Sequence, residues 1–293
     1  MTAVVAVVLN PGSGRAHEEL QAQVVDSLGG LGEVHRIEPS SNEAFAEDVR
    51  AGTEGADIVV AAGGDGTLNL TINALESHLS EFVFAVVPLG TGNDFARTLG
   101  LPSDPLAAAA SLTASAVREV DVGVASGARV RRLFINACLG GFPVDANKAI
   151  DGGLKQKLGP LAFAVGGAKA LGDLDESTVV VNDQRISECI ALGVGNGRTA
   201  GGGMEMWPSA SPDDGVLDVC ALSAGSIPAA LLLAGKVTSG NHESAPGVEM
   251  IRGREFVVEA DPPMEFNVDG ELVGLHTPAR FEIFGRTRFL SAE

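Results

Sequence analysis

The sequence predicts two domains of different fold class: an α/β domain with a parallel sheet and helices on both faces over residues 1–123, and a mainly antiparallel β-sandwich domain with a helical insertion over residues 124–293. In the first part, continuously apolar runs end in glycine and are each followed by a helix-like segment, which is typical of a parallel sheet buried on both faces. In the second part, alternating strands are separated by Gly, Asp, Pro and Ser turns, as in sandwiches. We leave open that the last few residues return to the first domain.

The first domain is expected to contain four strand and helix pairs followed by one more helix. The strands read AVVAVVLN, VHRIEP, ADIVVAAG and FVFAVVPLG, and the helices are expected at about residues 15–28, 42–50, 67–78 and 94–99. Asp104-Pro105 then supplies an N-cap and a first helical residue for the next helix. In sheets of this kind ligands bind outside the carboxyl ends of the strands, so the loops after the strands are the expected binding site.

The second domain is expected to consist of short strands from residue 132 onward. They read RLFINACLG, STVVVN, ECIALGVGN, VLDVCALS, REFVVEA, MEFNVDGELV and ARFEIFG. A helix-like insertion at about residues 144–175 interrupts them and holds four of the five lysines, Lys148, Lys155, Lys157 and Lys169. We favour the interpretation that this insertion packs on the sandwich. The alternative is a basic, apolar surface that docks to a membrane or receives acyl chains.

Length and charge restrict the function classes. A chain of 293 residues with 45% hydrophobic content is long enough for two domains with their own cores. Its net charge of −18 and pI near 4.6 argue against a nucleic-acid binder and against simple electrostatic adhesion to anionic lipid. The acidic surplus fits either a salt-adapted surface or an ordinary acidic protein.

The cysteines and apolar segments predict a soluble, cytoplasmic protein. Cys138, Cys189 and Cys220 form no CxxC pair, so we expect buried thiols in a reducing compartment rather than a disulfide framework or zinc site. The apolar run at residues 2–9 lacks a basic segment before it and is interpreted as a buried strand. The later run at residues 227–234 is too short to span a bilayer. Peripheral contact with the inner membrane face is left open.

Three glycine-bearing segments follow strands of the first domain, and we expect them to gather at one edge of the sheet. They are Asn10-Pro11-Gly12-Ser13-Gly14, Gly63-Gly64-Asp65-Gly66-Thr67 and Pro88-Leu89-Gly90-Thr91-Gly92-Asn93-Asp94. Glycines expose main-chain N–H groups and the following helices add their positive ends, which suits phosphates. Each segment alone is a weak signal, because none matches GxGxxG or the P-loop with its lysine. Together they predict nucleotide binding.

Asp65 is unexpected in a phosphate-binding loop. Two like charges about 4 Å apart cost roughly 4 kcal/mol at an effective dielectric constant near 20. The Asp65 carboxylate therefore needs another partner. A magnesium ion or an incoming hydroxyl group would meet that need.

With the motifs in place, the chain resembles the diacylglycerol kinase catalytic domain family, which includes bacterial lipid kinases and sphingosine kinases. The resemblance rests on N-P-x-S-G, G-G-D-G-T-x-N and P-x-G-T-x-N-D-F-A-R, then on N-G-R with G-G-G, P-S-A-S-P-D-D-G-V-L-D and a late D-G-E. It covers essentially the whole chain. G-G-D-G-T alone also occurs in NAD kinases, but G-T-G-N-D-F-A-R followed by a late D-G-E does not.

The resemblance implies an ATP- and Mg²⁺-dependent kinase that phosphorylates a lipid hydroxyl in the cleft between the two domains. It assigns ATP contacts to Asn10, Pro11, Gly12, Ser13, Gly14, Gly63, Gly64, Asp65, Gly66, Thr67, Leu68, Asn69, Thr91 and Asn93. It implies a magnesium-associated acidic network of Asp65, Asp94 and Asp121, and a structural Mg²⁺ held by Asp214 with the carbonyls of Ser211 and Val216. Phosphoryl transfer depends mainly on positioning and charge neutralisation, and hard oxygen ligands suit this metal.

Two carboxylates remain as candidates for the general base that takes the proton of the lipid hydroxyl. Glu271 falls at the position of the family's proposed base, and in the sphingosine branch the aspartate at the position of Asp65 is the usual proposal. We favour Glu271 and keep both. The stretch VDGEL by itself also predicts a hairpin turn, and a turn can present a glutamate.

The resemblance also implies partners and a role. We expect a lipid substrate with a free hydroxyl, diacylglycerol-like, a transient contact with a membrane surface, no nucleic acid, and a role in phospholipid biosynthesis. A homodimer is left open. The alternatives are an NAD kinase-like phosphotransferase with a soluble substrate and a non-catalytic, nucleotide-binding regulator.

Overall fold

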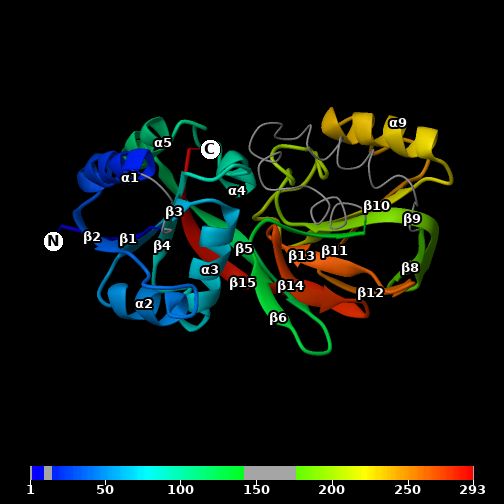
Figure 1. Cartoon of the computed structure of the whole chain (residues 1–293), viewed down its shortest axis with the longest axis horizontal. Coiled ribbons are helices and arrows are strands. Elements are labelled where there is room, and N and C mark those ends of the chain that lie inside the picture. Colours follow the sequence, from blue (N-terminus) through cyan, green and yellow to red (C-terminus); the bar gives the residue numbers. More distant parts are fainter. Residues whose placement is uncertain (1, 10–14, 142–175, 293) are drawn as a thin grey trace. The chain divides into compact units, whose positions relative to one another are not determined.

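The computed structural model describes residues 2–9, 15–141 and 176–292 (Figure 1). The candidate residues Asn10 to Gly14 and the expected insertion at residues 144–175 lie outside them. The chain forms two compact units, Met1–Val120 with Gly285–Glu293, and Asp121–Phe284. Both unit boundaries fall within long strands, β5 (Ala116–Ser126) and β15 (Ala279–Ser291).

The first unit contains the parallel sheet that the apolar runs predict. Its strands, in the order β2-β1-β3-β4-β15, are β2 (Glu33–Ile37), β1 (Val4–Leu9), β3 (Ile58–Gly63), β4 (Val83–Pro88) and the end of β15. In β1, β3 and β4 all residues after the first are buried. Burial on both faces explains why these strands read as continuous apolar runs without alternation.

Helices follow the strands as predicted. They are α1 (Arg15–Ser27), α2 (Phe45–Gly52), α3 (Asp65–Ala74), α4 (Asp94–Thr98) and α5 (Pro105–Ser111), with short 3₁₀ turns at Leu28–Gly30, Glu76–His78 and Leu112–Ala114. Helices α1 and α5 contact each other on one face of the sheet, and α2 and α3 contact each other on the opposite face (Figure 1). The Asp104 side chain caps α5 by accepting from the Ala107 N–H at 2.8 Å, which confirms the expected helix start.

The strand order places a topological switch point in this sheet. The chain moves from β1 to β2 in one direction and then crosses back to β3 and β4, so the connections leave β1 and β3 toward opposite faces. Ligands of open α/β sheets bind at the carboxyl ends of the strands beside such a reversal. The first two glycine segments of the sequence follow these two strands.

The C-terminal part of β15 belongs to the core of the first unit. The Phe289 ring lies 5.6 Å from the Phe84 ring and 5.1 Å from the Phe95 ring, centroid to centroid. The Thr287 hydroxyl donates to the Leu79 carbonyl at 2.7 Å, and the Ser291 hydroxyl donates to the Leu99 carbonyl at 3.1 Å. The last residues of the chain therefore complete the sheet of the first unit.

The second unit is mainly antiparallel. Its further strands are β6 (Arg131–Phe134), β7 (Ala137–Gly141), β8 (Ser177–Val181), β9 (Gln184–Gly195), β10 (Leu217–Ser223), β11 (Val248–Gly253), β12 (Glu255–Asp261), β13 (Glu265–Val268) and β14 (Glu271–His276). A core of buried aromatic rings that includes Phe134, Phe256, Phe266 and Phe281 joins them. A second cluster surrounds the fully buried Trp207, whose indole packs so closely on Gly195 that a Cβ there would lie 2.4 Å from it.

Four elements differ from the expectation. The expected single strand RLFINACLG is broken at Ile135-Asn136 into β6 and β7. Strands β5 and β11 were missed, and helix α9 (Ile227–Thr238) was noted only as an apolar stretch. Within the described ranges, no helix combines the length and apolar character needed to cross a bilayer.

The three cysteines should be unreactive in the folded protein. Cys138, Cys189 and Cys220 are buried and unbridged. Burial raises the pKa of Cys138 well above its usual value, and it raises the pKa of Cys189 to about 11 and of Cys220 to about 12. We expect no labelling by a chromogenic disulfide reagent at about pH 8, where an exposed thiol is partly ionised, and full labelling in denaturant. Rapid labelling of any cysteine before unfolding would contradict this packing.

Candidate functional site

The carboxyl ends of β3 and β4 lie side by side in the first unit. Gly63, the last residue of β3, pairs with Pro88, the last residue of β4, and Leu9 of β1 pairs with Ala62. The structure thus brings the second and third glycine segments together, as the sequence predicts. The first segment follows β1 at the same edge by sequence, but its residues lie outside the described ranges.

These two glycine loops touch through their main chains. A Cβ at Gly90 would lie 2.5 Å from the Gly64 Cα, and a Cβ at Gly64 would lie 3.2 Å from the Gly90 Cα. The Leu89 N–H also donates to the Gly63 carbonyl at 2.9 Å. Side chains at Gly64 and Gly90 would therefore push the loops apart, so these glycines are needed for the close approach of the two main chains.

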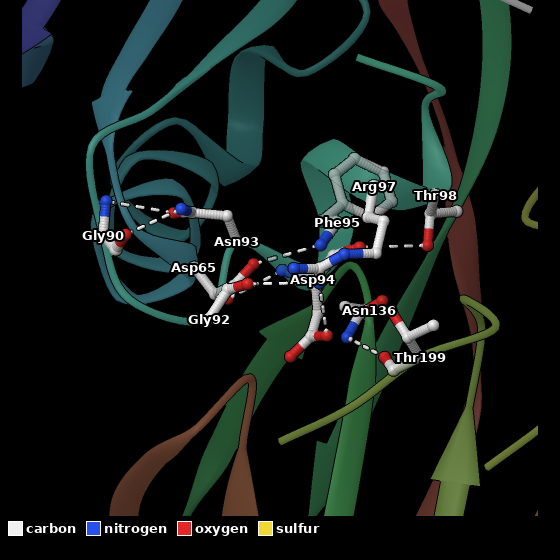
Figure 2. Close-up of polar contacts among 10 residues, drawn as sticks. All are labelled: Asp65, Gly90, Gly92, Asn93, Asp94, Phe95, Arg97, Thr98, Asn136 and Thr199. Carbon is white, nitrogen blue, oxygen red and sulfur yellow. Dashed lines mark hydrogen bonds and ion pairs between the residues drawn. The ribbon is translucent and has the colours of Figure 1, made fainter. Parts of the chain in front are cut away.

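Asn93 closes the loop that follows β4. Its backbone is left-handed, with φ 51°. Its side-chain oxygen accepts from the Gly90 N–H at 3.0 Å, and its Nδ2 donates to the Gly90 carbonyl at 2.7 Å (Figure 2). The Asn93 amide thus fixes the shape of this loop, and its contact with a nucleotide stays a prediction.

The Asp65 carboxylate joins the two loops through main-chain contacts that the motifs do not specify, while its contact with Mg²⁺ or a hydroxyl group stays a prediction. Asp65 is the first residue of α3. Its two oxygens accept from the main-chain N–H groups of Asp94 and Phe95, each at 3.1 Å (Figure 2). A carboxylate is favourable at the N-terminus of a helix such as α4, where N–H groups lack partners within the helix. Both oxygens of Asp65 are therefore engaged by the polypeptide.

Asp94 forms an ion pair that the sequence analysis did not anticipate. It is buried, and its Oδ1 lies 3.0 Å from Nη1 of Arg97. The same nitrogen donates to the Gly92 carbonyl at 3.1 Å (Figure 2). Arg97 thus places a half-exposed positive charge at a loop that has no P-loop lysine. The signal in the sequence was the i,i+3 spacing of acid and base in N-D-F-A-R.

The remaining candidate nucleotide-binding residues near these loops differ in whether their side chains are free to bind a ligand. Thr67 is buried, and among the described residues its Oγ1 has no hydrogen-bond partner. Asn69 is fully buried, and its side-chain oxygen accepts from Asn73 Nδ2 at 3.2 Å. Leu68 packs in the core and its N–H donates to the Gly64 carbonyl, whereas Thr91 is exposed. Thr67 and Thr91 are therefore better placed to bind a ligand through side chains.

In the second unit, Glu271 follows a tight hairpin turn. Asp269 and Gly270 connect β13 to β14, with φ values of 48° and 87°, and Val268 pairs with Glu271 across the turn. Two left-handed residues in a two-residue loop are the mark of a type I′ turn, so the hairpin that VDGEL predicts is confirmed. Glu271 is exposed at the start of β14.

Asp269 is a polar centre that the sequence analysis missed, because Asp-Gly was fully explained as a turn. Its carboxylate is buried and accepts three main-chain N–H groups, from Ile135 at 2.9 Å, Asn136 at 3.0 Å and Ala137 at 2.9 Å. Arg132 is partly buried nearby: burial lowers the pKa of its guanidinium, while the charges of Asp269 and then Glu271 oppose this shift. Arg132 is therefore within electrostatic reach of both carboxylates.

Asp121 holds the loop that carries the proposed structural metal site. It is fully buried, its Oδ2 accepts from the Gly215 N–H at 2.6 Å, and its N–H donates to the Pro212 carbonyl at 2.6 Å. Within the loop, the Ser211 hydroxyl donates to Asp213 at 2.6 Å. The turn that D-D-G predicts is thus attached to the first residue of the unit.

Arg252 already binds the carboxylate proposed as a metal ligand. Its Nη2 bonds to Asp214 Oδ2, while Asp214 Oδ1 accepts from the Val216 N–H at 3.1 Å. Its Nε lies 2.9 Å from Oδ1 of Asp218. Burial raises the pKa of Asp218, and Arg252 opposes the shift. A cation of the protein itself therefore offsets part of the negative charge of Asp214 and Asp218.

The oxygen atoms available around Asp214 are of the kind that bind a magnesium ion. Carboxylate and carbonyl oxygens are available at Asp214, Ser211 and Val216, and these suit hard cations. The described part of the chain holds no group of three or more His, Cys, Asp or Glu side chains in a metal-binding arrangement. The proposed site needs one carboxylate and two carbonyls, so it stays a prediction, with Arg252 as a competitor for Asp214.

Comparison with known proteins agrees with this organisation. The model of the diacylglycerol kinase catalytic domain matches residues 4–125, and that of the YegS C-terminal NAD kinase beta sandwich-like domain matches residues 138–287. A crystal structure from Bacillus anthracis str. Sterne, described as a "putative diacylglycerol kinase", superposes with a TM-score of 0.82 at 25% identity, covering 99% of this chain and 95% of the other.

Two similar proteins bear the name "Probable lipid kinase YegS-like". The protein from Xanthomonas oryzae pv. oryzae (strain MAFF 311018) is 37% identical over 229 residues, which cover 74% of this chain and 73% of the relative. The protein from Pseudomonas aeruginosa (strain UCBPP-PA14) is 39% identical over 222 residues, covering 73% and 69%. The chain therefore belongs to the diacylglycerol kinase catalytic domain family, among its YegS-like lipid kinases.

Proposed function

We propose that the protein is an ATP- and Mg²⁺-dependent lipid kinase that transfers the γ-phosphoryl group of ATP to a free hydroxyl of a diacylglycerol-like lipid. Membership of a lipid kinase family supports kinase activity on a lipid-like substrate. The observation that carries the proposal is the junction of two glycine loops at the carboxyl ends of β3 and β4, fastened by Asp65. Glycine loops at strand ends are suited to binding phosphates.

The chain's own residues would bind and orient ATP at this junction. The Thr67 hydroxyl is buried without a partner among the described residues, and the Thr91 hydroxyl is exposed, so both can donate to phosphate oxygens. Arg97 adds positive charge. Asp94, a carboxylate of the same loops, would help to hold Mg²⁺, which supplies charge neutralisation on the phosphates when it is bound.

Glu271 is the better general base of the two candidates. Asp65 accepts N–H bonds at both oxygens, so protonating it would weaken the contact between the loops. Glu271 is exposed at the start of β14. In the proposed step Glu271 takes the proton of the lipid hydroxyl while that oxygen forms a bond to the γ-phosphorus. The bond from the γ-phosphorus to the β,γ-bridging oxygen breaks, and ADP leaves.

The substrate class is tested with labelled ATP. The protein is incubated with γ-labelled ATP, Mg²⁺ and either a total lipid extract, diacylglycerol in mixed micelles, or soluble NAD. We expect label in the lipid phase, strongest with a diacylglycerol-like acceptor. Label on NAD alone would replace the lipid kinase by an NAD kinase-like activity, and no transfer to any acceptor would favour a non-catalytic nucleotide binder.

Glu271→Gln tests the base. We expect kcat to fall by about 10²- to 10⁴-fold, the usual contribution of a general base, with the KM for ATP unchanged. Glu259→Gln changes another exposed glutamate of the same unit and should leave kcat unchanged. Full turnover in E271Q would rule out Glu271 as the base.

Asp65→Asn should raise the KM for ATP and lower the Tm, because the amide presents only one acceptor to two N–H donors.

Competition between Arg252 and Mg²⁺ for Asp214 tests the structural metal site. Arg252→Gln removes the competing cation, so we expect its Tm to be lower than that of the wild type in EDTA and to rise more on adding Mg²⁺. A ligand at ten times its Kd stabilises by about 1.4 kcal/mol, or a few °C. The double variant R252Q/D214N should lose this Mg²⁺ response. An equal rise in Tm with Mg²⁺ in R252Q and in R252Q/D214N would mean that the metal binds elsewhere.

A further inference from the structure

The Asp269 carboxylate makes more contacts than a hairpin turn requires. The chain contains a comparable turn between β8 and β9, where Asn182 is also left-handed, with φ 52°. Asn182 anchors its turn with a neutral amide, whose oxygen accepts from the Val257 N–H at 2.8 Å. A carboxylate is therefore not needed to attach a hairpin of this unit to neighbouring main chain.

Asp269 instead satisfies three N–H donors on consecutive residues. Ile135 and Asn136 connect β6 to β7 and interrupt what would otherwise be one strand, and Ala137 is the first residue of β7. Three donors directed at one side chain need two acceptor oxygens, which an aspartate has and an asparagine lacks. The Asp269 N–H also donates to the Ala137 carbonyl at 2.8 Å. The turn and the 135–137 segment are thus held together by four hydrogen bonds.

The geometry points to Asp269 as a positioning residue for Glu271. This inference rests on the proposed function, because it takes Glu271 to be the base. Only Gly270 separates the two residues, and both residues of the turn have positive φ, so the clamp on Asp269 determines where β14 starts. Arg132, within electrostatic reach of both carboxylates, balances the charge that the buried Asp269 brings.

Asp269→Asn tests this role. Asparagine has nearly the same shape as aspartate and also tolerates a left-handed backbone. Its NH₂ group cannot accept a hydrogen bond, so at least one of the three main-chain N–H donors loses its acceptor. We expect kcat to fall by about 10- to 100-fold, as for a small misplacement of a reacting group, with the KM for ATP unchanged. Asn182→Ala is the matched control: it loosens the other turn and should lower the Tm while leaving kcat unchanged. Wild-type kcat in folded D269N would overturn the inference.

Combining D269N with E271Q separates positioning from a general loss of structure. If Asp269 acts through Glu271, the double variant should be no slower than E271Q alone. A loss equal to the product of the single losses would mean that Asp269 has only a structural role. Wild-type turnover in E271Q would instead contradict the proposed base, so the two failures are distinguishable.

A second variant covers the case in which D269N does not fold. Asp269→Glu keeps the charge and both acceptor oxygens but lengthens the side chain by one methylene group, so the turn and Glu271 should shift relative to residues 135–137. We expect kcat to fall while ATP binding, measured by calorimetry, is retained. Unchanged kcat in folded D269E would overturn the inference even without D269N.

Discussion

The bond of the Asp65 carboxylate to two main-chain N–H groups is the interaction on which the candidate site of the first unit depends. It ties the start of α3 to the start of α4. The Gly64 and Gly90 main chains also meet closely, and a Cβ at Gly90 would lie only 2.5 Å from the Gly64 Cα. The proposed phosphate-binding surface consists of two loops, so it requires a contact that holds the two loops together.

Carboxylates serve the same purpose elsewhere in the chain. Asp121 holds the Gly215 N–H, and Asp269 holds three N–H groups between β6 and β7. A carboxylate bonded to main-chain N–H groups is stabilised by dipoles and hydrogen bonds, so it can be buried with less need of a counter-ion. Several acidic residues that the motifs assign to metal binding or catalysis are therefore also required to shape the loops that carry them.

The parallel strands could be predicted from the sequence because burial on both faces leaves a continuous apolar run, as in VVAVVL and IVVAAG. Strand β11 has no buried residue among its six, which explains why it gave no signal. The site partners could not be predicted: Asp65 and Asp94 are 29 residues apart, and Asp269 and Ile135 are 134 apart. Such contacts depend on the register of the sheets, which a motif does not specify.

The proposal that Glu271 rather than Asp65 is the base rests on what protonation of each carboxylate would cost. Protonating Asp65 would turn an acceptor of two N–H bonds into a group with a proton of its own, and each lost hydrogen bond to a charged group costs about 1.5–3 kcal/mol. That cost would recur in every turnover. Glu271 is exposed and begins a strand, while the neighbouring Asp269 carries the contacts that hold the turn. A base that must gain and lose a proton is better placed where its protonation breaks no contact of the fold.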